Sequence, residues 1–205
     1  ITMIVECDMA QMLYPSTVLR QRNPCAKAKT FCMQNLIYKY TNKSVDPYDL
    51  RNPKQSSLWG ARERLSNLLN NPFVRQSLGV DEYDPEWNLH FTRVRDALVD
   101  HFVIDYTHDV ASLLNNGIRF LVYAGDQDYV CNWINNKKWV LNMNWKNTVE
   151  MNEAEDIPYM MNNDIVIGYM RKSNNLLYFL KFLNAGHAVP SDQPESALKM
   201  FTDFI

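Results

Sequence analysis

Several features are absent from this sequence, and each absence excludes a class of protein. The formal net charge is −2, so the chain lacks the basic excess that binding to nucleic acid requires. No apolar run approaches the roughly 20 residues that a membrane-spanning helix needs, and the N-terminus lacks the charged and apolar regions of a signal peptide. We therefore expect neither a nucleic acid nor a membrane as a partner.

The cysteines and histidines do not have the spacing of a metal site. Cys7, Cys25, Cys32 and Cys131 form no C-x-x-C pair, and the histidines do not cluster at the spacing of zinc ligands. We expect no metal and no cofactor. Four cysteines allow three full pairings, which the sequence does not decide. Asn42 begins an N-x-S glycosylation sequon, and together with the cysteines it favours an oxidising, secretory compartment.

The composition is that of a folded domain, because 46% of the residues are hydrophobic and 21% are charged. The first residues, ITMIVE, resemble the interior of a longer polypeptide, so we expect a processed or truncated piece. The first part of the chain is uneven. It predicts one or two helices broken at Pro15 and Pro24, followed by a polar loop over residues 41–57.

From residue 58 onward the pattern becomes regular and predicts an α/β fold. The expected helices lie at 59–70, 72–79, in part of 84–102, and at 107–116, 132–143 and 194–205. A strand is expected at Ile118–Tyr123, and two further strands should be joined by a polar turn at 173–175. The continuous apolarity of Ile118–Tyr123 is typical of a strand in a parallel sheet, covered on both faces.

Two residues with catalytic chemistry follow these strands directly. Asp126 and His187 each stand in a turn of small residues, and in open α/β sheets the ligand crevice lies beyond the carboxyl ends of the strands. The carboxylate would orient the imidazole, which would then act as a general base. Asp128 is a rival carboxylate, and turn formation alone would also explain either aspartate. Cys131 could be a nucleophile, but its surroundings favour a small buried hydrophobe.

Two segments resemble the C-terminal signatures of the serine carboxypeptidase family. LVYAGDQDYVCNW is similar to the family's strand-Gly-Asp-x-Asp motif, and NAGHAVPSDQPESALKMF to its Gly-x-Gly-His-x-Val-Pro motif, with Asn184 at the first glycine. The second motif matches at Gly186, His187, Val189, Pro190, Asp192, Pro194 and Ala197. LNNPFVRQSLGV and VDPYDLR resemble further family segments, so the resemblance spans nearly the whole chain.

The resemblance implies the fold and the catalytic pair. Residues 58–205 would form the C-terminal half of an α/β-hydrolase fold, and residues 1–57 would belong to a helical insertion, or cap. Asp126 would be the triad acid and His187 the triad base. By the same resemblance the catalytic serine would come from elsewhere, because no serine in this chain has the glycine neighbours of the family's Gly-Glu-Ser-Tyr nucleophile.

The resemblance also assigns the substrate pocket and the cysteines. Cys131 and, by a looser alignment, Phe102 would border the pocket. Ala188 stands where many members carry a larger residue, which would open the pocket. The insertion of the family is rich in cysteine, and the resemblance favours a Cys7–Cys32 disulfide.

The prediction is therefore part of a serine carboxypeptidase that hydrolyses C-terminal peptide bonds. An N-terminal chain or segment would supply the nucleophilic serine and the oxyanion hole, as in members that are cleaved into two chains. Peptides are the expected substrates, a homodimer is compatible with the sequence, and the expected location is the secretory pathway, in a vacuole or lysosome or outside the cell. The alternatives are a carboxypeptidase-like acyltransferase, a hydroxynitrile lyase, or an inactive binding relic.

Overall fold

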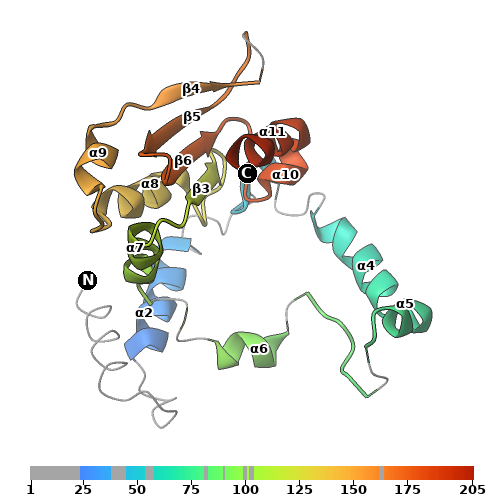
Figure 1. The fold of residues 1–205 in the computed structure, drawn as a ribbon. Helices are drawn as coiled ribbons and strands as arrows, with labels where there is room; N and C mark the ends of the chain where they lie inside the picture. Colours follow the sequence, from blue (N-terminus) through green and yellow to red (C-terminus); the bar gives the residue numbers. More distant parts are fainter. Residues whose placement is uncertain are drawn as a thin grey trace. The chain divides into compact units, whose positions relative to one another are not determined.

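The structure is a computed structural model, and it describes most of the chain (Figure 1). The described residues are 24–37, 45–53, 58–80, 83–89, 91–98, 101, 104–161 and 164–205. They divide into two compact units, of which the first takes in 1–40 and 52–104 and the second 41–51 and 105–205. Residues 46–51 belong to the second unit because they hydrogen-bond to loops far along the chain. The expected division at residue 58 into a cap and a hydrolase core stays a prediction.

The regular structure of the described part of the first unit is helical, apart from residues 52 and 53, which end a strand. Its elements are α2 (Pro24–Cys32), the π-helical turn η1 (Met33–Ile37), α4 (Leu58–Leu69), α5 (Pro72–Ser77) and α6 (Thr92–Ala97). Asn71 caps α5 as the sequence predicts, because its side chain accepts hydrogen bonds from the amides of Phe73 and Val74. Gly79 follows this helix with φ +70°, the left-handed conformation expected of a C-terminal glycine. Local sequence signals therefore place these helix ends correctly.

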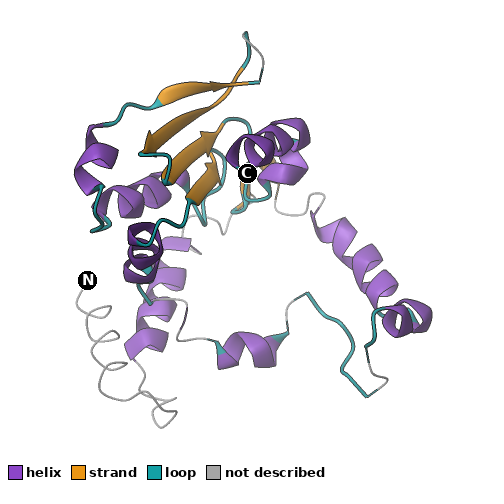
Figure 2. Cartoon of the chain, in the orientation of Figure 1, coloured by secondary structure: helices purple, strands orange, loops and turns teal. Residues whose placement is uncertain are grey.

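The second unit is built on a mixed sheet of four strands (Figure 2). Their order is β3 (Phe120–Gly125), β6 (Leu177–Phe182), β5 (Val166–Ser173) and β4 (Ile157–Met160). β3 runs parallel to β6, and the other neighbours are antiparallel. The expected strand and hairpin are confirmed, and Asn174 and Asn175 form the hairpin turn with φ of +46° and +52°. β4 was not predicted, because Pro158 interrupts its pattern, although an edge strand tolerates proline.

Helices and one hairpin complete the second unit. The helices are α7 (Thr107–Asn115), α8 (Trp133–Asn142), α9 (Thr148–Glu153), α10 (Val189–Asp192) and α11 (Pro194–Phe204). The expected helices at 107–116, 132–143 and 194–205 are confirmed, and the Asn132 side chain caps α8 by accepting from the amide of Asn135. The loop expected over 41–57 is wrong in part, because β1 (Val45–Asp46) and β2 (Asp49–Pro53) pair as a short hairpin.

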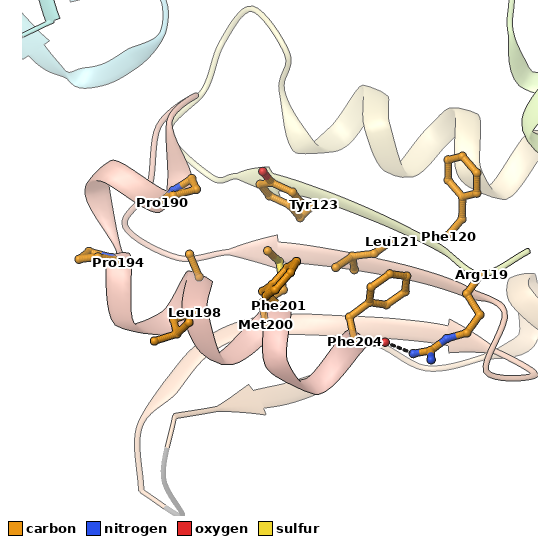
Figure 3. A pocket seen from close by; sticks show the side chains of 11 residues that line it. Arg119, Phe120, Leu121, Tyr123, Pro190, Pro194, Leu198, Met200, Phe201 and Phe204 are labelled. Atoms are coloured by element: carbon orange, nitrogen blue, oxygen red, sulfur yellow. Dashed lines mark hydrogen bonds between the residues drawn. The ribbon is translucent and has the colours of Figure 1, made fainter. Parts of the chain in front are cut away.

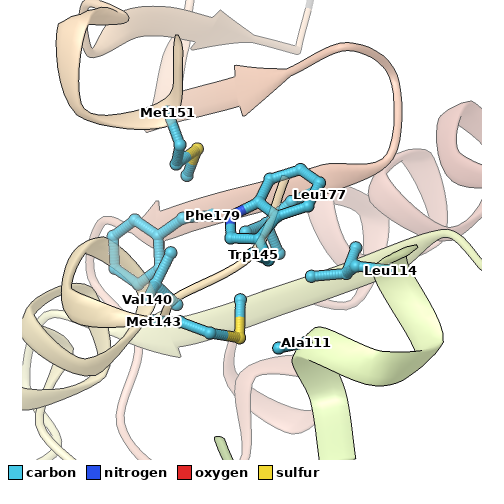
Figure 4. Close-up of a cluster of buried hydrophobic side chains, with 8 residues drawn as sticks. All are labelled: Ala111, Leu114, Val140, Met143, Trp145, Met151, Leu177 and Phe179. Atoms are coloured by element: carbon cyan, nitrogen blue, oxygen red, sulfur yellow. The ribbon is translucent and has the colours of Figure 1, made fainter. Parts of the chain in front are cut away.

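Two apolar clusters cover opposite faces of the sheet. Leu177 and Phe179 of β6 pack with buried residues of α7, α8 and α9 in the first cluster (Figure 4). Leu180 and Phe182, which have the opposite parity along β6, pack with Val189 and with residues of α11 in the second. The second unit thus has three layers, helix–sheet–helix, as expected of an α/β fold. None of its helices, nor any other helix among the described residues, is long and apolar enough to span a membrane.

The prediction that β3 is covered on both faces is wrong. β3 lies at the edge of the sheet, and Tyr123 is 42% exposed. An apolar groove of about 660 Å³ lies between β3 and α11 (Figure 3). Its walls include Leu121 and Tyr123 on one side and Leu198 and Phe201 on the other. A continuous apolar run in a strand indicates that both faces are to be buried. It does not indicate that residues of this chain bury them.

Candidate active site

The site lies where β3 and β6 end side by side. Because these strands are parallel, their carboxyl ends meet at one edge of the sheet, with Gly125 opposite Phe182. The pairing continues into the loops, since the Asp126 amide donates to the Phe182 carbonyl at 2.9 Å. A Cβ atom on Gly125 would stand 2.2 Å from the carbonyl oxygen of Ala185. This close approach explains the glycine and brings together the loop after β3 and the loop that carries His187.

His187 is paired with Asp128. The Nδ1 atom of His187 lies 2.7 Å from Oδ2 of Asp128. The Asp128 side chain is only 3% exposed, whereas the His187 side chain is 47% exposed. The acid predicted from the resemblance, Asp126, is not the partner of His187 in the structure, because its Oδ1 atom instead accepts a long hydrogen bond from the Ala185 amide at 3.4 Å. The catalytic roles of both residues stay predictions.

The backbone explains why the second aspartate of the motif is the partner. The Asp126 amide is still bound to Phe182 at the end of β6, and the Gln127 amide to Ala185 in the loop that follows, so the first aspartate remains next to the sheet. The amide of Asp128 is the first to turn back, towards the Gly125 carbonyl. The position directly after the strand is therefore too early in the loop for its side chain to meet the imidazole.

The Asp128–His187 pair has the polarity that a general base needs. A carboxylate can only accept, so Nδ1 of His187 donates and Nε2 keeps its lone pair. The buried charge of Asp128 also stabilises the imidazolium that forms when Nε2 takes up a proton. Because the His187 ring is half exposed, a group outside the described residues can reach it and give it this proton.

Cys131 lies beside this pair. Its backbone amide donates to Oδ1 of Asp128 at 3.0 Å, so it helps to hold the acid. Partial burial of the thiol and the nearby charge of Asp128 raise the pKa of Cys131, which disfavours the thiolate that a nucleophile needs. The expectation of a buried residue is wrong, because Cys131 is exposed.

Side-chain atoms of Asp128, Cys131 and His187 lie within 4.8 Å of one another, close enough for metal ligands. Both oxygens of Asp128 already accept hydrogen bonds from the other two residues. Hydrogen bonding thus accounts for the cluster, and the absence of a metal stays a prediction.

A hairpin from an early part of the chain borders the site. The His187 amide donates to the carbonyl of Tyr48 at 2.8 Å, and the two rings meet edge to face with centroids 5.1 Å apart. On the other loop, the amides of Tyr129 and Val130 donate to the Pro47 carbonyl at 3.0 and 3.2 Å. These residues were not predicted to border the site, although the resemblance of VDPYDLR to a family segment is a signal for them.

Comparison with known proteins agrees with this geometry. A family model described as serine carboxypeptidase matches residues 6–205. The chain belongs to the serine carboxypeptidase family. It is 36% identical over 183 residues to serine carboxypeptidase-like 48 of Arabidopsis thaliana. It is 33% identical to a serine carboxypeptidase-like protein of Pisum sativum and to carboxypeptidase Y homolog A of Talaromyces stipitatus. The matches cover 88%, 86% and 88% of this chain.

The same serine carboxypeptidase relatives are longer than this chain. The matched region spans 35%, 60% and 34% of their respective lengths. A crystal structure of Kex1(delta)p, a prohormone-processing carboxypeptidase from Saccharomyces cerevisiae, superposes with a TM-score of 0.65 at 16% identity. That match covers 98% of this chain and 51% of the other, so the chain has part of the α/β-hydrolase fold, as predicted.

The remaining serine carboxypeptidase assignments stay predictions. Phe102, Asn42 and Cys7 lie outside the described residues. Cys32 is exposed and has a free thiol. Its proposed disulfide with Cys7 involves a residue outside the described ones and remains a prediction. Ala188 directly follows His187 and precedes α10, a position compatible with a role in the substrate pocket.

Proposed function

We propose that this chain is the catalytic-base part of a serine carboxypeptidase that removes C-terminal amino acids from peptides. The observation that carries the proposal is the 2.7 Å contact between His187 and the buried Asp128 at the carboxyl ends of two parallel strands. A histidine in this arrangement is suited to serve a nucleophile that approaches its second nitrogen.

In the proposed reaction, a serine hydroxyl attacks the carbonyl carbon of the last peptide bond while Nε2 of His187 takes its proton. The resulting imidazolium is stabilised by Asp128 through the hydrogen bond at Nδ1. His187 then gives the proton to the leaving amine. Water hydrolyses the acyl-enzyme with His187 again as the base, which restores the serine.

The serine is proposed to lie in an N-terminal segment or chain of the same enzyme. Among the described residues, no serine hydroxyl hydrogen-bonds to His187, whose ring bonds to Asp128. The longer relatives have room for such a segment, since this chain spans 34–60% of the length of the three compared above. That segment would also carry the oxyanion hole.

The groove between β3 and α11 is the proposed seat for that segment. β3 lies at the edge of the sheet, and Leu198 and Phe201 of α11 are 66% and 57% exposed in the groove (Figure 3). An unpaired strand edge beside exposed apolar side chains is a surface that proteins normally cover. A segment that adds strands at β3 would bury both.

The proposed seat predicts a difference between two substitutions in the full-length protein. Leu198→Asp should lower its stability by about 2 kcal/mol or more, because a charge would be buried under the added segment. Val149→Asp on α9 is the matched control, since Val149 is 68% exposed and should tolerate the change to within about 0.5 kcal/mol. Thermal or denaturant unfolding measures both, and equal effects of the two substitutions would argue against the seat.

The main test of the function is labelling of the full-length protein with a fluorophosphonate probe. We expect one modified serine outside these 205 residues, and hydrolysis of peptides that have a free C-terminal carboxylate. An acyltransferase would instead react preferentially with an acyl-glucose donor. Failure of the folded full-length protein to label would leave the inactive relic as the better reading.

The expected location and partners remain proposals. We propose secretion or delivery to a vacuole or lysosome, supported by the family membership and by the glycosylation sequon at Asn42. Intact mass of the native protein, before and after reduction, would reveal a glycan, a disulfide-linked companion chain, or a homodimer held by disulfides.

A further inference from the structure

The Asp46–Arg51 hairpin contacts both loops of the site. Oδ1 of Asp46 accepts from the Tyr48 amide at 2.9 Å, which fixes the turn whose carbonyls receive the loop amides. The Leu50 amide donates to the Gln127 carbonyl at 3.0 Å, on the loop that carries Asp128. The hairpin therefore links the loop of the acid to the loop of the base.

Arg51 adds a side-chain contact from the hairpin to the loop that carries His187. Its guanidinium forms a two-point ion pair with Asp49, with distances of 2.8 and 2.6 Å. Its Nη1 atom donates to the Asn184 carbonyl at 2.6 Å, three residues before His187. The hydrogen bond from Arg51 lowers the pKa of Asp49, so the carboxylate stays charged and holds the guanidinium in place.

Asp192 joins the same set of contacts, because it binds both Arg51 and the loop that carries His187. Its Oδ2 atom accepts from the Gly186 amide at 2.6 Å and from Nη2 of Arg51 at 3.1 Å. Asn184 has φ +56°, a left-handed conformation, so this part of the loop is not held by regular pairing. Arg51 and Asp192 thus fix the backbone on both sides of Ala185, directly before His187.

The approach of the hairpin leaves little freedom for the loop. A Cβ atom on Gly186 would lie 2.5 Å from the Tyr48 carbonyl oxygen and 2.8 Å from Cβ of Asp49. The backbone before His187 is therefore packed directly against the hairpin, and a shift of one moves the other.

We propose that Arg51 and Asp192 are positioning residues that set the orientation of the His187 imidazole towards Asp128 and the nucleophile. The inference rests on the proposed function for its catalytic consequence, but its geometric part does not. A misplacement of about 1 Å in a reacting group can cost on the order of a hundredfold in rate. The contacts of Arg51 and Asp192 therefore affect the rate through the orientation of the His187 ring rather than through the substrate.

The test uses Arg51→Gln and Asp192→Ala in the full-length protein. We expect kcat per fluorophosphonate-titrated site to fall on the order of tenfold to a hundredfold, with KM changed by less than about twofold. In NMR spectra, the resonance of the His187 Nδ1–H proton should broaden through faster exchange with water. Asp192→Asn keeps an oxygen for the Gly186 amide and should recover part of both effects.

Arg171→Gln is the matched control. Arg171 also joins a carboxylate to backbone carbonyls, those of Asp156, Met151 and Asn152, but it lies away from the site. The control should lower the melting temperature while leaving kcat per titrated site and the Nδ1–H resonance unchanged. A purely structural role for Arg51 would make the two arginine variants behave alike, and that result would overturn the proposal.

The two hypotheses fail in distinguishable ways. An unlabelled, inactive wild-type protein would refute the proposed function, while the Nδ1–H resonance would still report on positioning. If Arg51→Gln does not fold, Asp192→Asn and Asp192→Ala decide by the same resonance. An unchanged resonance in the Asp192→Ala variant would refute the positioning role whatever the activity.

Discussion

Replacement of His187 by alanine in the full-length protein should lower kcat by roughly 10⁴- to 10⁶-fold. The physical reason is that His187 is the described side chain that pairs with the buried Asp128, at 2.7 Å from Nδ1, and can therefore act as the base. Without the imidazole, the serine keeps its proton and the leaving amine receives none. Substrate binding does not depend on this proton transfer, so KM should change far less than kcat.

The control for this prediction is His108→Ala. His108 lies on α7, is exposed, and has no place in the site, so the variant should retain wild-type kcat. Steady-state hydrolysis of a peptide substrate measures both variants, and fluorophosphonate labelling should disappear in the first alone. A His187→Ala variant that is folded and still labels at the wild-type rate would remove His187 from the mechanism.

Local signals in the sequence predicted the elements that depend on neighbouring residues. Asn71 and Asn132 cap their helices as expected, because capping involves only the next two or three amides. The turn at Asn174 and Asn175 was also predictable, since these residues adopt positive φ readily. These are short-range interactions, and their outcome is written within a few positions of the chain.

The elements that failed depend on distant partners. The hairpin around Pro47 and Tyr48 was predicted as a loop, because its polar sequence is stabilised by loops about 80 and 140 positions along the chain. For β3 the prediction overestimated burial. Its apolar side chains predicted cover on both faces, and the second face is open to a groove.

The site was partly predictable for the same reason. A histidine in a small-residue turn after a strand, together with the family resemblance, predicted His187 as the base, and the structure pairs this residue with a buried carboxylate. The choice between Asp126 and Asp128 depended on how far backbone pairing continues past Gly125, which residue types do not encode. The positioning roles of Arg51 and Asp192 depend on contacts across 133 and 141 positions, which no local pattern indicates.

The most discriminating prediction compares the two aspartates of the Gly-Asp-x-Asp motif. Asp128→Asn should lower kcat on the order of 10⁴-fold, because an amide cannot stabilise the imidazolium and favours the wrong ring tautomer. Asp126→Asn should lower it by less than about tenfold, since the 3.4 Å hydrogen bond that Asp126 accepts from the Ala185 amide can be kept by the side-chain oxygen of asparagine.

Each substitution removes one negative charge and preserves the shape of the side chain, and the two positions are only two residues apart. Each variant therefore serves as the control for the other. Melting temperatures should be compared first, because Asp128 is buried and also accepts from the Cys131 amide at 3.0 Å. The kinetic difference must then persist per titrated active site. A larger loss of kcat in Asp126→Asn than in Asp128→Asn would identify Asp126 as the acid. It would also mean that the loop after β3 has a different conformation in the full-length enzyme.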